Sequence, residues 1–139
     1  MEWQPLVPEL LVSDFDKSLR FYVSVLGFTI KFQRQNPPFA YLEFEGSQLM
    51  IEELEEDSWL VGELAHPFGR GMNLQIECSD VAEIRKRVDV AGIAVFRELY
   101  DAYYEAGRVV FGQRQFLVTD PDGYLLRFGQ VISERRLDE

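Results

Sequence analysis

The chain has 139 residues, of which 47% are hydrophobic and 27% are charged. This length suits one domain that removes about two thirds of its unfolded surface from water, and the composition is typical of a soluble globular protein. The one Cys excludes an intrachain disulfide and a cysteine-based zinc or iron–sulfur site. The formal net charge of −10 disfavours nucleic acid and anionic membranes as partners and favours a cationic ligand.

No apolar run reaches the roughly 18 residues that a membrane span needs. The first residues, MEWQPLVPELLV, lack the basic run of a secretory signal. We therefore expect a cytoplasmic protein.

The first half of the chain predicts a strand, a helix and three further strands. Apolar and polar residues alternate over 5–13, as in a strand with one buried face. Asp14 is placed to cap a helix over 17–25, and Gly27 is placed to end it. The three strands that follow are expected at residues 28–33, 39–45 and 48–53, the last two forming a hairpin about Gly46-Ser47.

The second half repeats this order after a linker at 54–71, which holds an acidic run and Trp59. A strand is expected at 73–78, followed by a helix that starts at Asp80 and ends at Gly92. Three more strands are expected at residues 94–99, 113–119 and 124–131, with Asp120-Pro121-Asp122-Gly123 as the last turn. The half-repeats therefore span residues 5–53 and 72–131 of one domain, 1–139.

Two similar sheets can close around a shared hollow. In this interpretation the helices cover the faces that carry Leu10, Val12, Leu74 and Ile76. The other faces would line the hollow with polar residues, namely Glu9, Glu43, Glu52, Asn73, Gln75, Glu77 and Arg127. A solvent-exposed sheet face would give the same alternation, so the pattern leaves both readings open.

Three segments carry a family resemblance: VPELLVSDFDKSLRFYVSVLGF, GRGMNLQIECSDV and RQFLVTDPDGYLLRF. From about Pro5 to about Val131 the chain resembles the glyoxalase, bleomycin-resistance and extradiol-dioxygenase superfamily, also called vicinal oxygen chelate. The resemblance implies an α+β fold in which two βαβββ repeats form a curved, cup-like mixed sheet.

The resemblance also implies where a metalloenzyme of this family would hold its divalent ion. Those positions are occupied here by Val7, Glu52, Asn73 and Arg127. Val7 has no donor atom and Arg127 is a permanent cation, so one carboxylate and one weak amide remain. We therefore expect no metal, no other cofactor and no catalytic residue, as in the metal-free bleomycin-resistance type.

Proteins of that type resemble this chain in being small and acidic, and they bind a cationic aromatic glycopeptide at a homodimer interface without chemistry. The resemblance thus implies a homodimer that sequesters a cationic aromatic small molecule. The candidate ligand-binding residues are Phe32, Phe39, Tyr41, Glu52, Trp59, Tyr103, Tyr104, Phe111 and Arg127. Phe32 and Phe39 would equally suit the core, and Glu52 would suit a salt-bridged strand position. Tyr103, Tyr104 and Phe111 are expected in a polar loop.

Two other functions remain open. One is a metal-dependent lyase, isomerase or dioxygenase with donors from Glu9, Glu52, Asn73 or Glu77. The other is a module that binds a different metabolite.

Overall fold

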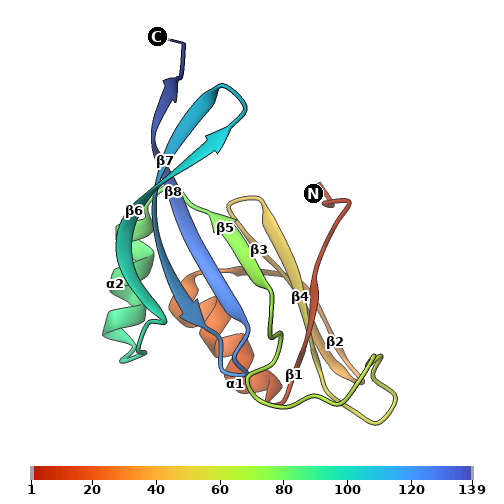
Figure 1. The fold of residues 1–139 in the computed structure, drawn as a ribbon. Helices are drawn as coiled ribbons and strands as arrows, with labels where there is room; N and C mark the ends of the chain where they lie inside the picture. Colours follow the sequence, from red (N-terminus) through yellow and green to blue (C-terminus); the bar gives the residue numbers. More distant parts are fainter. Residues whose placement is uncertain (1, 139) are drawn as a thin grey trace. The chain divides into compact units, whose positions relative to one another are not determined.

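The computed structural model describes residues 2–138 and divides into two compact units, each built around one four-stranded sheet (Figure 1). Unit 1 comprises residues 2–70 together with Asp120–Tyr124, and unit 2 comprises Gly71–Thr119 together with residues 125–138. Within residues 2–138, no helix has the length and apolar character needed to cross a membrane.

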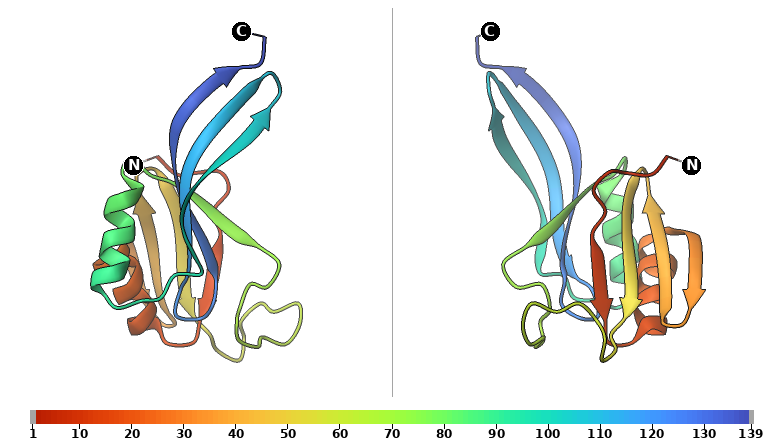
Figure 2. Two further views of the ribbon diagram at one scale, coloured as in Figure 1. Left: turned by 60° about the vertical axis from the view of Figure 1, so that its left-hand side comes forward. Right: turned by 90° about the vertical axis from the view of Figure 1, so that its right-hand side faces the viewer.

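Unit 1 has the predicted strand–helix–strand–strand–strand order. Its elements are β1 (Glu9–Val12), α1 (Phe15–Leu19), the π-helix η1 (Arg20–Leu26), β2 (Thr29–Gln35), β3 (Pro38–Phe44) and β4 (Ser47–Glu53). The strands lie in the order β1-β4-β3-β2, and β1 runs parallel to β4 while the other pairs are antiparallel (Figure 2).

The helical segment of unit 1 begins and ends at the predicted residues. The Asp14 carboxylate accepts a hydrogen bond from the Lys17 backbone N–H at 3.1 Å, which satisfies one of the unpaired donors at the start of α1. Gly27 ends η1 with φ at 94°, a left-handed conformation that disfavours residues with a Cβ.

The core of unit 1 lies between the helical segment and one face of the sheet. Leu10 and Val12 are buried, as the alternation predicts. Aromatic rings connect the two layers, since Tyr22 of η1 packs edge-on against Phe28, and Phe28 packs against Phe44 of β3. The opposite face of the sheet is thus left to residues of the other parity.

Unit 2 repeats the order with β5 (Asn73–Glu77), α2 (Val81–Val90), β6 (Arg97–Ala106), β7 (Val109–Thr119) and β8 (Leu125–Arg136). The strands lie in the order β5-β8-β7-β6, with β5 parallel to β8. Val81, Ile84 and Val88 of α2 are buried, together with Phe116 and Phe128 of the sheet. Both units therefore have the βαβββ order, and the α+β fold class is confirmed.

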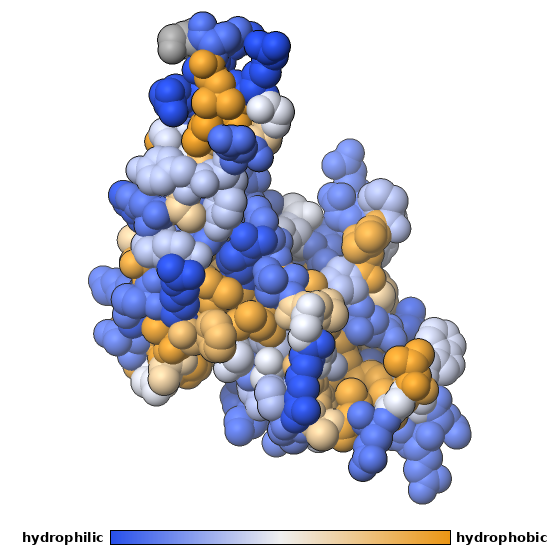
Figure 3. Space-filling view, viewed as in Figure 1, coloured by the Kyte–Doolittle hydropathy of each residue, from blue (hydrophilic) through white to orange (hydrophobic). Residues whose placement is uncertain are grey.

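The last three strands are longer than the alternation predicted. The expected strand at 94–99 is instead β6, which starts at Arg97 and continues to Ala106, and the residues expected in a polar loop lie in β6 and β7. Polar composition misled the prediction, because charges in these strands pair across the sheet: Asp101 on β6 forms a 2.8 Å ion pair with Arg114 on β7. The far ends of β6–β8 project beyond α2 (Figure 2), with apolar side chains exposed among hydrophilic ones (Figure 3).

The turn between β7 and β8 belongs to unit 1, where its carboxylates are buried. The Tyr22 hydroxyl donates a 2.8 Å hydrogen bond to Asp120, whose other oxygen accepts from the backbone N–H groups of Asp122 and Tyr124. Asp122 accepts from both the backbone N–H and the hydroxyl of Ser13. Burial raises the pKa of Asp120 from 3.8 to about 6, although the bonds from Tyr22 and the backbone act to lower it.

This raised pKa predicts how stability depends on pH. A carboxylate whose pKa is higher in the folded than in the unfolded state favours folding most below its unfolded pKa of 3.8, and this contribution is lost as pH rises through about 6. The difference corresponds to about 3 kcal/mol of unfolding free energy. We expect urea unfolding between pH 4 and 7 to show this loss in the native protein and not in Asp120→Asn, whose side-chain oxygen still accepts the backbone bonds.

Tyr22→Phe is the matched variant for that measurement. It removes the hydroxyl bond that lowers the pKa of Asp120, so the loss of stability should extend to higher pH. An identical pH profile in the native protein and Asp120→Asn would contradict the prediction.

Candidate functional site

The sheet of unit 1 presents one face away from its helical segment, which we call the open face. Register places eight of its residues in two rows across β2, β3, β4 and β1. The rows are Arg34–Phe39–Glu52–Leu11 and Phe32–Tyr41–Met50–Glu9. Aromatic side chains thus lie at the β2–β3 end of the open face and carboxylates at the β4–β1 end.

The aromatic end is a packed cluster. The rings of Phe32 and Tyr41 stack with centroids 5.2 Å apart, and Phe39 lies 5.8 Å from Phe32. Trp3 packs edge-on against Tyr41 at 5.0 Å and against Phe32 at 5.9 Å. The Arg34 guanidinium lies 4.5 Å from the centroid of Phe39 and 5.4 Å from that of Phe32, in cation–π geometry.

The acidic end brings two carboxylates close together. Glu9 and Glu52 occupy neighbouring rows on the adjacent strands β1 and β4. Desolvation raises the pKa of Glu52, the negative charges of Glu9 and Glu55 raise it further, and the positive charge of Arg34 lowers it. A cation placed here would relieve the repulsion between these groups, so this end favours positive charge.

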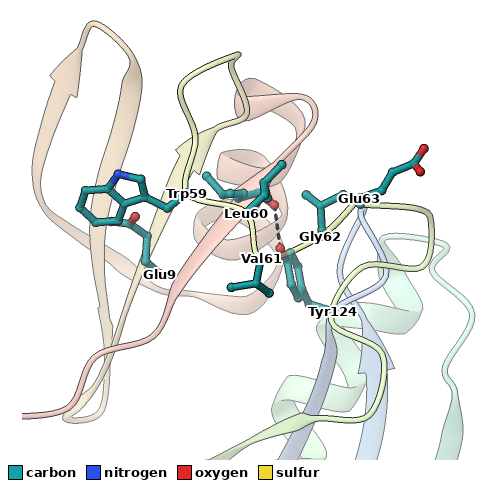
Figure 4. A pocket seen from close by; sticks show the side chains of 9 residues that line it. Glu9, Trp59, Leu60, Val61, Gly62, Glu63 and Tyr124 are labelled. Carbon is teal, nitrogen blue, oxygen red and sulfur yellow. Dashed lines mark hydrogen bonds between the residues drawn. The ribbon is translucent and has the colours of Figure 1, made fainter.

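A pocket of about 330 Å³ adjoins the acidic end, between β1 and the segment at 59–64 (Figure 4). Trp59 and Glu9 lie at one end of it, Tyr124 lies at the other, and Glu63 points away. The Tyr124 hydroxyl donates a 2.9 Å hydrogen bond to the Leu11 carbonyl, which ties the pocket wall to β1. Trp59 is 93% exposed, so its indole is free to contact a ligand.

Gln48 ties the residues that precede β1 to the open face. Its side-chain oxygen accepts hydrogen bonds from the Tyr41 hydroxyl and from the Gln4 backbone N–H, and its side-chain nitrogen donates to the Glu2 carbonyl at 2.7 Å. Gln48 is 7% exposed, and these bonds satisfy its amide. The backbone beside Trp3 is therefore held in place.

The four remaining predicted site residues lie in unit 2, and the structure separates two of them. Tyr104 faces Phe111 across β6 and β7, so these rings share the sheet face that points away from α2. The neighbouring Tyr103 faces Gly112 on the opposite side, where a Cβ on Gly112 would lie 3.0 Å from its ring. Tyr103 and Tyr104 therefore cannot contact one ligand from the same face of this sheet.

The face that carries Tyr104 also holds a buried amide network. The Gln115 side-chain nitrogen donates to the hydroxyls of Tyr100 and Tyr104, and Gln113 donates to the Gln115 oxygen at 2.7 Å. The Gln113 side chain packs directly against Gly129. A Cβ on Gly129 would lie 2.5 Å from the Gln113 side-chain nitrogen, so a larger residue would clash with it.

Arg127 lies on the same face of unit 2 and is bound to a neighbouring strand. Its guanidinium donates a 2.9 Å hydrogen bond to Gln75 on β5, whereas its buried Nε has no hydrogen-bond partner among the described residues. A buried donor of this kind suits an acceptor on a ligand.

Comparison with known proteins accounts for this architecture. Residues 6–128 match the Glyoxalase/Bleomycin resistance protein/Dioxygenase superfamily. The chain belongs to this superfamily. The chain is 31% identical to a lactoylglutathione lyase of Haemophilus influenzae over 124 residues, which cover 86% of each protein. It is 27% identical to a bleomycin resistance protein of Geobacillus stearothermophilus, over 91% of this chain and 96% of that protein.

A solved structure shares the fold. TioX from Micromonospora sp. ML1 superposes with a TM-score of 0.70 and 25% identity, over 91% of this chain and 98% of that one. One of these relatives is named a lyase and another a resistance protein, so superfamily membership by itself does not identify the function of this chain.

The residues at the positions where the resemblance predicts metal ligands do not fit a divalent ion. Val7 offers no donor, and the Arg127 guanidinium would repel the ion. No group of three or more His, Cys, Asp or Glu side chains in residues 2–138 has an arrangement that could hold a metal. The side chains of Val7 and Arg127, and not the fold, therefore disfavour a divalent ion at these positions.

Sequence reasoning did not include two residues of the aromatic end, Trp3 and Arg34. Arg34 had a usable signal, because it directly follows the strand predicted at 28–33 and continues its alternation in phase with Phe32. Trp3 had none, since it lies outside every helix and strand and meets Tyr41 only through the tertiary structure.

The acidic end makes a prediction about Glu52. Because the charge of Glu9 raises the pKa of Glu52, Glu9→Gln should lower that pKa, while desolvation keeps it above its usual value of 4.5. An NMR titration of the Glu52 carboxyl carbon measures this directly. Glu43→Gln is the control on the same face, because Glu43 is not among the causes of the raised pKa. An unchanged Glu52 titration in Glu9→Gln would contradict the prediction.

Proposed function

We propose that this chain is a non-catalytic binding protein that sequesters a cationic aromatic small molecule, with a bleomycin-type glycopeptide as the leading candidate. The observation that carries the proposal is the open face of unit 1, where the aromatic cluster shares its rows with Glu52 and Glu9. A ligand with a planar ring and a positive group fits this polarity. The likeness to bleomycin resistance proteins supports the choice of ligand.

Each element of the face has a role in this proposal. Phe32, Phe39 and Tyr41 hold the planar part, because aromatic pairs add about 1 kcal/mol beyond their buried area. Glu52 pairs with the positive part, and Trp59 forms a wall beside it. Tyr104, Phe111 and Arg127 are proposed as a second group of contacts from unit 2, and Tyr103 as a contact of its opposite face.

Stoichiometric binding is the whole mechanism in this proposal. A submicromolar dissociation constant corresponds to more than about 8 kcal/mol of binding free energy, and no bond in the ligand needs to change. We further propose that the chain acts in the cytoplasm as a homodimer, which the family resemblance and the exposed aromatic residues support.

Calorimetric titration with metal-free bleomycin tests the proposal. We expect submicromolar binding of one ligand per chain that weakens with added salt, because surface charge contributes and ions screen it. Glu52→Gln should weaken binding roughly fivefold, since a partly exposed ion pair contributes up to about 1 kcal/mol. Affinity should also fall as the pH is lowered through the raised pKa of Glu52, because protonation removes the charge that attracts the cation.

Glu83→Gln on α2 is the matched control, because it removes the same charge from an exposed helix position. Phe111→Ala tests whether unit 2 contributes. Absence of binding heat with the native protein would remove bleomycin as the ligand, and equal effects of Glu52→Gln and Glu83→Gln would remove the role of the acidic end.

The second candidate is a metal-dependent lyase, isomerase or dioxygenase that uses a non-standard set of donors. The adjacent carboxylates Glu9 and Glu52, together with the likeness to lactoylglutathione lyase, favour it. Elemental analysis after purification with added divalent metal separates the two functions. We expect no stoichiometric metal, since a pair of carboxylates is a weak site, whereas one equivalent that Glu52→Gln abolishes would support the enzyme.

A further inference from the structure

Two aromatic rings of the open face, those of Phe39 and Tyr41, are buried. Phe39 is 2% exposed and Tyr41 is 6% exposed, although neither lies on the side of the sheet that packs against the helical segment. A ligand therefore cannot stack on these rings unless something moves. Arg34 and Trp3 are among the side chains that contact these rings, since the Arg34 guanidinium lies over Phe39 and the Trp3 indole packs against Tyr41.

Arg34 places a positive group on the aromatic cluster. Its guanidinium lies over Phe39 at 4.5 Å and also reaches Phe32 at 5.4 Å. In the register of the sheet, Phe39 lies between Arg34 and Glu52, and the charge of Arg34 acts on Glu52. A planar cation stacked on Phe39 would meet the same ring and the same carboxylate.

Trp3 adds a further aromatic ring to the cluster. Its indole packs edge-on against Tyr41 and Phe32, the two stacked rings of the cluster. The backbone on either side of Trp3 is bonded to the Gln48 side chain. The Glu2 carbonyl accepts a hydrogen bond from it, and the Gln4 N–H donates one to it. The Trp3 side chain can therefore rotate away while its backbone stays in place.

We propose that Trp3 and Arg34 act as a built-in ligand of the aromatic cluster, and that the true ligand binds by displacing both side chains. This inference rests on the proposed function and defines its ligand more closely, as a planar aromatic group that carries its positive charge within reach of Phe39. Both displaced side chains are already exposed, Trp3 by 57%, so displacement costs little more than their ring contacts.

Titration with proflavine, a planar aromatic cation, tests the displacement by fluorescence anisotropy of the dye. Removing a competing side chain should tighten binding, and the combined strength of the ring and cation–π interactions predicts a gain of about tenfold for Trp3→Ala with Arg34→Ala. Arg97→Ala is the matched control, because its guanidinium stacks on Tyr100 of unit 2 at 3.6 Å and its removal changes the net charge equally. Each single variant should show part of the gain.

A second readout follows Trp3 itself. The chain contains two Trp residues, so its NMR spectrum has two indole N–H signals, and Trp3→Phe assigns them. Ligand binding to the native protein should move the Trp3 signal toward that of a solvated indole. A Trp3 signal that instead shows new ring-stacking on the ligand would overturn displacement.

The remaining outcomes are distinct from those of the bleomycin titration. Weaker or unchanged dye binding in the double variant, relative to Arg97→Ala, would overturn the displacement, as would failure of every variant to bind the dye. Bleomycin binding without any gain in the double variant would refute the displacement alone. A gain for the dye without bleomycin binding would refute the drug as ligand and leave the displacement standing.

Discussion

The hydrogen bond from the Tyr22 hydroxyl to the buried Asp120 carboxylate fixes the position of the candidate pocket. Burying a carboxylate costs free energy unless its oxygens are bonded, and Asp120 meets this requirement with one hydroxyl and two backbone donors. One of those donors is the N–H of Tyr124, whose ring lines the pocket beside β1. The turn Asp120–Tyr124, which is distant in sequence from the rest of unit 1, thereby becomes part of that unit. Its Tyr124 lines the same pocket as Glu9.

The division of chemistry across the open face follows from the register of its strands. Side chains on alternate positions of β2 and β3 place aromatic rings together, while β4 and β1 place Glu52 and Glu9 together. Rings and carboxylates on one surface attract the same class of molecule, a cation with an aromatic group. Arg34 already makes such a contact within the protein, since its guanidinium lies 4.5 Å from the centroid of Phe39.

The superfamily joins enzymes and binding proteins on one fold, so the fold alone does not separate them. The resemblance places the metal ligands of the family's enzymes at four positions of this chain. A metal site needs several donor atoms, and two of the four family positions hold Val7 and Arg127. The buried Nε of Arg127 instead offers a donor for a ligand acceptor.

Local patterns in the sequence determined the βαβββ order, the helix start at Asp14 and the end at Gly27, because alternation, capping and left-handed glycine are properties of neighbouring residues. They also placed Glu52, Phe39 and Tyr41 on one face. Only the tertiary structure decided the full length of β6, where Asp101 pairs with Arg114, and the cover that Trp3 provides over Tyr41. These contacts join residues distant in the sequence, and no periodicity along the chain records which distant side chains will meet.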